Sequence, residues 1–184
     1  MTTQRILPQA AVAFAASLLL LPLVACHSKT AATPENFTVA LNAYFTDHPD
    51  CLFPNPPSFP YETTDPEKTR QMNALVASQL LTVHQAVLLH ESRYTVTAAG
   101  ARVAPRFCFG HRIATAIDSS TPPTNNNGML QTQVAYHYTL QDVPVWAKTD
   151  QMRAAFPAMA QAIGGAASDK ATLGKTMVDW QVVE

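Results

Sequence analysis

The segment Leu130–Leu140 reads LQTQVAYHYTL, and its side chains alternate between two chemical kinds. The first kind is apolar or aromatic and comprises Leu130, Val134, Tyr136, Tyr138 and Leu140. The second kind is polar and comprises Gln131, Gln133 and His137, followed by Gln141 directly after the segment. Because successive side chains of a strand point to opposite faces, this pattern predicts a β-strand with one buried and one wet face.

The residues before this strand predict a hairpin. Asn127-Gly128 is a dipeptide that two-residue hairpin turns favour. Further upstream, Phe107–Ile117 has Phe107, Phe109, Ile113 and Ile117 at alternating positions, which predicts the partner strand. Additional strands are predicted over Arg93–Thr97 and Met177–Val183.

Helical spacing predicts three helical regions around these strands. Asn36 is a capping residue for a helix through Phe45, and Asp65-Pro66-Glu67 starts a helix that should reach about Leu89, whole or broken near Ser78-Gln79. A third helix starts at Asp150 and is kinked or divided at Pro157. This order predicts an α+β fold, with N-terminal helices packed on an antiparallel β-sheet, in one compact domain spanning residues 36–184.

The N-terminus has a different composition from the rest. Ala10–Ala25 reads AAVAFAASLLLLPLVA without a charge, and Arg5 is the only charged residue before it. A membrane-spanning helix needs about 20 apolar residues. This run is shorter and contains Pro22, so it predicts a signal peptide over residues 1–25.

The end of that signal, Leu23-Val24-Ala25-Cys26, resembles the lipobox of bacterial lipoproteins. The resemblance implies cleavage before Cys26, with fatty acids such as palmitate on its sulfur and its new amino group. Stable membrane anchoring needs more than one acyl chain, which agrees with this double modification. Residues 26–35 are then a lipidated tether.

The residue after the lipidated cysteine implies a location. In lipoproteins of the enteric type an aspartate there favours retention in the inner membrane, whereas this chain has His27. The resemblance therefore implies a lipoprotein on the periplasmic side of the outer membrane. The formal net charge of −1 becomes −2 when Arg5 leaves with the signal, which argues against nucleic acid as a partner.

A second, local resemblance concerns Arg93-Tyr-Thr-Val-Thr-Ala-Ala-Gly100. With the helical stretches before it, this segment resembles the second half of a winged-helix domain and its wing, where Y-x-[LV]-T-x-x-G is common. The resemblance implies a local fold, and DNA binding is not inferred from it because the chain is predicted to be exported and mildly acidic.

The three cysteines divide into an anchor and a pair. Cys26 is used by acylation, and in the oxidising periplasm Cys51 and Cys108 are expected to form a disulfide. Two free thiols are one alternative. Another is a zinc site of His48, Cys51, Cys108 and His111, although Cys108 and His111 point to opposite faces of a regular strand unless Gly110 forms a bulge.

Familiar catalytic motifs are missing from the sequence. It contains no G-x-S-x-G, H-E-x-x-H, Walker or G-x-G-x-x-G pattern. We therefore expect a non-catalytic binding module that uses no cofactor and whose partner is an envelope protein or a cell-wall component. The alternative is a small envelope enzyme with His111 or His137 as its base.

Overall fold

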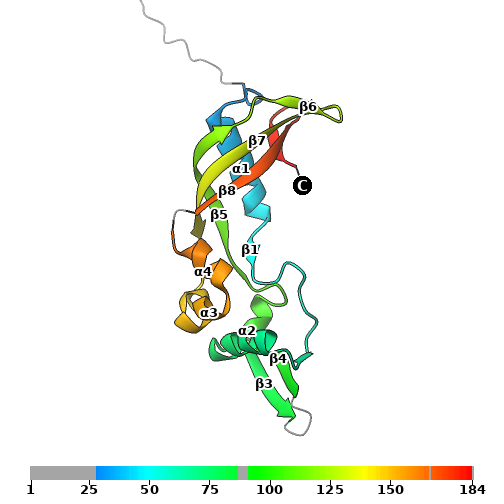
Figure 1. The fold of residues 1–184 in the computed structure, drawn as a ribbon, viewed down its shortest axis with the longest axis vertical. Coiled ribbons are helices and arrows are strands. Elements are labelled where there is room, and N and C mark those ends of the chain that lie inside the picture. The colour runs from blue at the N-terminus through cyan, green and yellow to red at the C-terminus, as the bar shows by residue number, and fades with distance from the viewer. Residues whose placement is uncertain (1–27, 87–90, 166, 184) are drawn as a thin grey trace, which may run out of the picture.

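The computed structural model describes residues 28–86, 91–165 and 167–183 (Figure 1). The predicted signal peptide, Cys26 and His27 lie outside these residues. The strands are β1 (Asp50–Cys51), β2 (Tyr61–Thr63), β3 (Leu81–Ala86), β4 (Glu91–Val96), β5 (Cys108–Ser120), β6 (Thr124–Asn126), β7 (Met129–Gln141), β8 (Ala167–Lys175) and β9 (Trp180–Val182). The helices are α1 (Pro34–Asp47), α2 (Pro66–Ala77), α3 (Asp150–Ala155) and α4 (Pro157–Ile163), with short 3-10 turns η2 (Gly100–Arg102) and η3 (Val145–Lys148).

The main sheet is built around the predicted hairpin. Its order is β1-β5-β7-β8-β9, with β6 paired to β7, and every pairing is antiparallel. The predicted turn residues Asn127 and Gly128 both have positive φ, at 51° and 83°, as a tight hairpin turn requires. The alternation of the opening segment is confirmed, because Val134, Tyr136 and Tyr138 are buried on one face of β7.

Helix α1 covers the buried face of this sheet and packs on β5 and β9. The ring of Phe37 on α1 meets the ring of Trp180 on β9 edge to face, with centroids 5.2 Å apart. The helix is capped by the Thr33 side chain, not by Asn36 as predicted. The Asn36 amide is used elsewhere, donating to the carbonyl oxygens of Ser28 and Ala31.

The predicted helix from Asp65 to Leu89 is wrong in its second half. Helix α2 ends at Ala77, and β3 begins four residues later. Between them Gln79 has a φ of 62°, a left-handed conformation that no continuing α-helix can include. Thr82 and Val83 are β-branched residues that favour a strand, and they pair with β4. Helical spacing alone could not separate these two segments.

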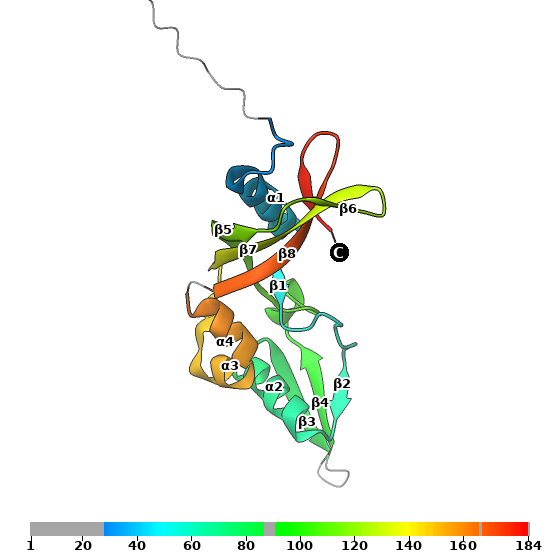
Figure 2. The same ribbon diagram turned by 45° about the horizontal axis from the view of Figure 1, so that its top comes forward.

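A three-stranded sheet, ordered β2-β4-β3, forms with α2 the lower part of the molecule (Figure 2). A second apolar core fills this part of the molecule. In this core the ring of Phe53 contacts the rings of Phe107 and Phe156, in both cases edge to face. Pro157 divides the third helical region as predicted, giving α3 and α4. The cap of α3 is Thr149 instead of the predicted Asp150.

These elements confirm the α+β fold with antiparallel sheets. The helices are distributed over the two sheets: α1 packs on the main sheet, α2 on β3, and α3 on α2. In the part of the chain that the structure describes, no helix has the length and apolar character needed to cross a membrane.

Candidate functional site

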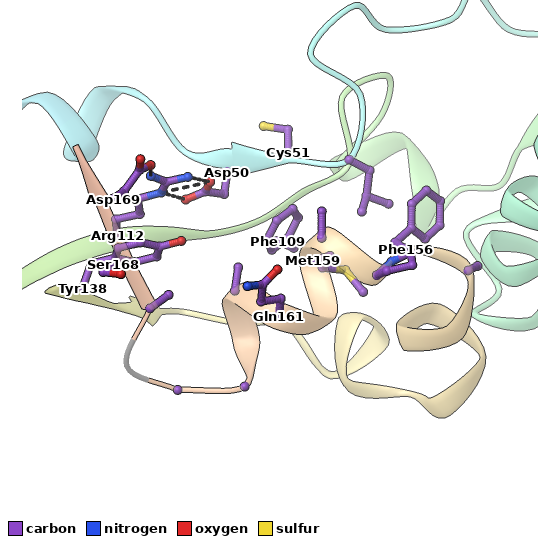
Figure 3. A pocket seen from close by; sticks show the side chains of 18 of the residues that line it. Asp50, Cys51, Phe109, Arg112, Tyr138, Phe156, Met159, Gln161, Ser168 and Asp169 are labelled. Carbon is purple, nitrogen blue, oxygen red and sulfur yellow. Dashed lines mark hydrogen bonds and ion pairs between the residues drawn. The ribbon is translucent and has the colours of Figure 1, made fainter. Parts of the chain in front are cut away.

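A cleft of about 960 Å³ lies where the main sheet meets α4 (Figure 3). Its walls come from segments far apart in the sequence, namely β1, β5, β7, α4 and the start of β8. The side chains at its two ends differ in chemistry. One end is charged and contains Asp50, Arg112 and Asp169, and the other is apolar and contains Phe109, Phe156 and Met159.

Arg112 on β5 organises the charged end. Its Nε lies 3.0 Å from Asp50 Oδ2 and its Nη2 lies 3.0 Å from Asp50 Oδ1, so the pair is bidentate. Its Nη1 donates to Asp169 Oδ2 on β8 over 2.6 Å. The guanidinium carbon lies 4.5 Å from the centroid of the Tyr138 ring on β7. One side chain therefore links β1, β5 and β8 across the aromatic surface of β7.

This environment keeps Arg112 charged. Burial opposes its charged form, but the hydrogen bonds that Arg112 donates to Asp50 and Asp169 outweigh that effect and raise the pKa of Arg112 above its usual value. Burial also raises the pKa of Tyr136, whose hydroxyl lies 3.5 Å from Arg112 Nη1, and of Tyr138. Two aspartates around one arginine give this end a formal charge of −1.

The apolar end follows from the break between α3 and α4. Phe156 is the residue between the two helices, and its side chain is buried against Phe53. Met159 is buried on the first turn of α4, and Phe109 is buried on β5. Amide groups of Gln71 and Gln161 also line the cleft. Phe109, Phe156 and Met159 are largely buried and form the floor of the cleft at this end, with hydrogen-bonding groups along its side.

The predicted disulfide is present at the edge of this cleft. The sulfurs of Cys51 and Cys108 are 2.01 Å apart, and the two residues are paired in register on β1 and β5. The zinc alternative with His48 and His111 is wrong, as is the alternative of two free thiols, because a sulfur in a disulfide is neither a thiol nor a thiolate ligand. Within the described ranges, no cluster of three metal-ligating side chains occurs.

The histidines proposed from the sequence lie apart from the cleft lining. His48 stacks on the Tyr44 ring with centroids 3.9 Å apart. His111 Nδ1 lies 3.6 Å from Asp142 Oδ2, and His137 Nε2 lies 3.1 Å from Asp118 Oδ1. The other nitrogen of His137, Nδ1, is buried without a hydrogen-bond partner. This nitrogen therefore has no contact with solvent, whereas the His137 side chain as a whole is 45% exposed.

Sequence reasoning missed the residues of the charged end. Asp50 and Asp169 are 62 and 57 residues from Arg112 and meet it only because of the strand order. Strand β8, which carries Asp169, was also missed because Ala167–Lys175 contains few apolar residues. The sequence contained one indication of this site, because Arg112 lies on the same face of the predicted strand as the uncharged Gly110 and Ala114.

Comparisons of the chain with protein-family models, with curated proteins and with solved structures found no match. The residues of the cleft and their contacts are therefore the basis for inferring what the protein does.

Proposed function

We propose that this protein is a lipid-anchored lipoprotein of the bacterial envelope, on the periplasmic side of the outer membrane, that binds a partner in the cleft. The observation that carries the binding proposal is the division of one cleft of about 960 Å³ into an apolar end and an acidic end. Binding sites are typically concave and largely apolar, with a few polar groups that fix orientation. The lipobox residues that end in Cys26 support the location.

The lining indicates which partner chemistry fits. Phe109, Phe156 and Met159 are largely buried and form an apolar floor, against which an apolar side chain can pack. Asp169 is 49% exposed, so its carboxylate is accessible to a basic group of the partner. A segment of an envelope protein that carries an apolar residue near a basic one matches both ends. A cell-wall glycan would use the apolar end less well.

Arg112 has a positioning role in this proposal. Its Nε, Nη1 and Nη2 atoms all contact aspartates, so its donors are engaged with the protein. These contacts hold β1 and β8 at fixed places beside the cleft. An anionic ligand would have to displace Asp50 or Asp169, whereas a cationic group would meet the excess acidic charge directly.

Site-specific photocrosslinking in cells tests the proposal. A benzophenone amino acid replaces Gln161, which lines the cleft, or Val145, which is 82% exposed and lies outside its lining. We expect a discrete protein adduct from position 161 and none from position 145. Adding Ala158→Trp, which places a bulky ring in the cleft wall, should remove that adduct. Identical adducts from both positions, or an adduct unaffected by Ala158→Trp, would overturn the cleft as the binding site.

A further inference from the structure

The turn between β8 and β9 presents two apolar side chains to solvent. Met177 is 98% exposed and Val178 is 67% exposed. Both lie at the tip of the turn over residues 176–179, which extends from the end of the main sheet (Figure 2). Met129, at the start of β7, is also exposed and lies with Met177 along one shallow groove. Apolar side chains are therefore gathered at this end of the molecule.

The turn holds these side chains outward by its own hydrogen bonds. The Thr176 hydroxyl lies 2.6 Å from Asp179 Oδ1, and the backbone N–H groups of Val178 and Asp179 donate to the Thr176 hydroxyl oxygen. The N–H of Thr176 donates to the carbonyl oxygen of Asp179 over 2.8 Å. A turn closed in this way cannot fold Met177 back onto the sheet without breaking several of these bonds.

The segment leading to Cys26 is fixed at the same end. The indole N–H of Trp180, the residue after the turn, points to the carbonyl oxygens of Thr30 and Ala31 at 3.3 and 3.1 Å. The Asn36 amide holds the carbonyl oxygens of Ser28 and Ala31 from α1. Ser28 is two residues from Cys26, and two residues span at most about 7 Å. Acyl chains on Cys26 would therefore bring this end of the domain close to a bilayer.

Two lysines lie at this end of the molecule, together with the carboxylate of Asp179. Lys175 lies at the end of β8 and Lys29 lies beside the β9 residues. Lysines next to inserted apolar residues interact favourably with anionic headgroups. The Asp179 carboxylate, the nearest acidic group on the turn, accepts a hydrogen bond from Thr176. Asp179 lies at the base of the turn, whereas Met177 and Val178 are the exposed residues at its tip.

We propose that Met177 and Val178 insert into the interface of the bilayer that holds the lipid anchor, so that the domain docks on the membrane by its β8–β9 turn. This inference rests on the proposed acylation of Cys26. Burial of exposed apolar side chains in the acyl region supplies the favourable free energy, and the anchor supplies proximity. The domain would then have a fixed orientation, with α4 and the start of β8, which line the cleft, at the end of the main sheet away from this turn (Figure 1).

The test uses the full chain extracted from membranes and reconstituted in phosphatidylethanolamine–phosphatidylglycerol vesicles. Met177→Cys is labelled with the environment-sensitive fluorophore NBD, and Val145→Cys, on the η3 turn packed against α3, is the control. With Cys26 acylated and Cys51 bonded to Cys108, each variant has one free thiol. We expect emission from position 177 to shift to shorter wavelength and to be quenched by lipids with a nitroxide near the headgroup. Position 145 should show neither effect.

Each contrary outcome has a distinct meaning. Incorporation of two probes per chain would overturn the acylation of Cys26 and hence the anchoring itself. One probe per chain with the same emission and the same lack of lipid quenching at positions 177 and 145 would overturn only the docking. A shift at position 177 that requires a high protein-to-lipid ratio and is not quenched by the lipids would assign the turn to a second copy of the chain, which also overturns membrane docking.

Discussion

The guanidinium of Arg112 holds the carboxylate of Asp50 through two nitrogens, one residue before the disulfide at Cys51. Strand β1 has only two residues, Asp50 and Cys51, so backbone pairing contributes little to its attachment. An ion pair and a covalent bond, both directed to β5, attach it instead. This arrangement fixes one wall of the cleft and leads to specific expectations about stability.

Removal of the Asp50 carboxylate should destabilise the protein. The side chains of Arg112 and Asp50 are 22% and 18% exposed, so Asp50→Asn leaves a largely buried charge without its main partner. We expect a loss of about 1.5–3 kcal/mol in the free energy of unfolding, measured by urea denaturation. Asp169→Asn is the control, because that pair is more exposed and should cost less than about 1 kcal/mol. Equal losses from the two variants would contradict the geometry described.

Removal of the disulfide should have a larger effect. The bond joins residues separated by 57 positions. The entropy of closing such a loop predicts a loss of about 4 kcal/mol for the double variant Cys51→Ser, Cys108→Ser. The free energy of unfolding from urea titration measures this loss, and a thiol count of the denatured protein with and without reductant verifies the bond. An unchanged thiol count on reduction would show that Cys51 and Cys108 are not joined.

Stability should fall at alkaline pH because of two tyrosines. Burial raises the pKa of Tyr136 and of Tyr138 above the value of about 10 that the unfolded chain has, although Arg112 opposes both shifts. Their contribution is therefore fully present below pH 10 and is lost as the pH rises through the folded pKa values. Unfolding free energies measured between about pH 8 and about pH 11 should decline, and the slope should be smaller in the variant Tyr136→Phe, Tyr138→Phe. If the slope of the unfolding free energy against pH were the same in this variant, Tyr136 and Tyr138 would not be the groups responsible for the loss of stability.

Gly100→Ala should be strongly destabilising. A Cβ at this position would overlap the backbone carbonyl oxygen of Leu80, which cannot move without disturbing the start of β3. We expect a loss of about 1–3 kcal/mol, seen as a lower midpoint of thermal unfolding. Gly164→Ala is a matched control, since its Cβ would lie 3.3 Å from the Ala160 carbonyl oxygen and its φ is −66°. A larger effect at Gly164 than at Gly100 would contradict this packing.

The local features of the fold were predictable from the sequence because they depend on neighbouring residues. The alternation in Leu130–Leu140, the Asn127-Gly128 turn and the division at Pro157 are each encoded within a few positions. The disulfide followed from the number of cysteines and the predicted compartment, and the structure contains it. Such inferences need no knowledge of which strands become neighbours.

The predictions that were wrong or missing concern features that depend on more than the neighbouring residues in the sequence. Helical spacing continued past Ala77, and only the left-handed conformation of Gln79 ends the helix. The alternation predicted for Phe107–Ile117 does not hold throughout, because the pairing of β5 with β1 is irregular near Gly110, and beyond this irregularity Ala114 is buried instead of Ile113. The Arg112 contacts depend on strand order, which a single sequence does not encode locally. The histidines stood out by residue type, but their placement away from the cleft depends on the complete fold.

The proposed anchoring through Cys26 can be tested by the mass of the N-terminal peptide of the mature protein. For protein taken from the membrane fraction, we expect a peptide that begins at Cys26 and carries a diacylglycerol group on sulfur and a fatty acid on the amino group. Cys26→Ser should abolish both modifications and release or mis-sort the protein. A peptide that begins at another residue, or one with an unmodified Cys26, would show that the protein is not anchored through acylated Cys26.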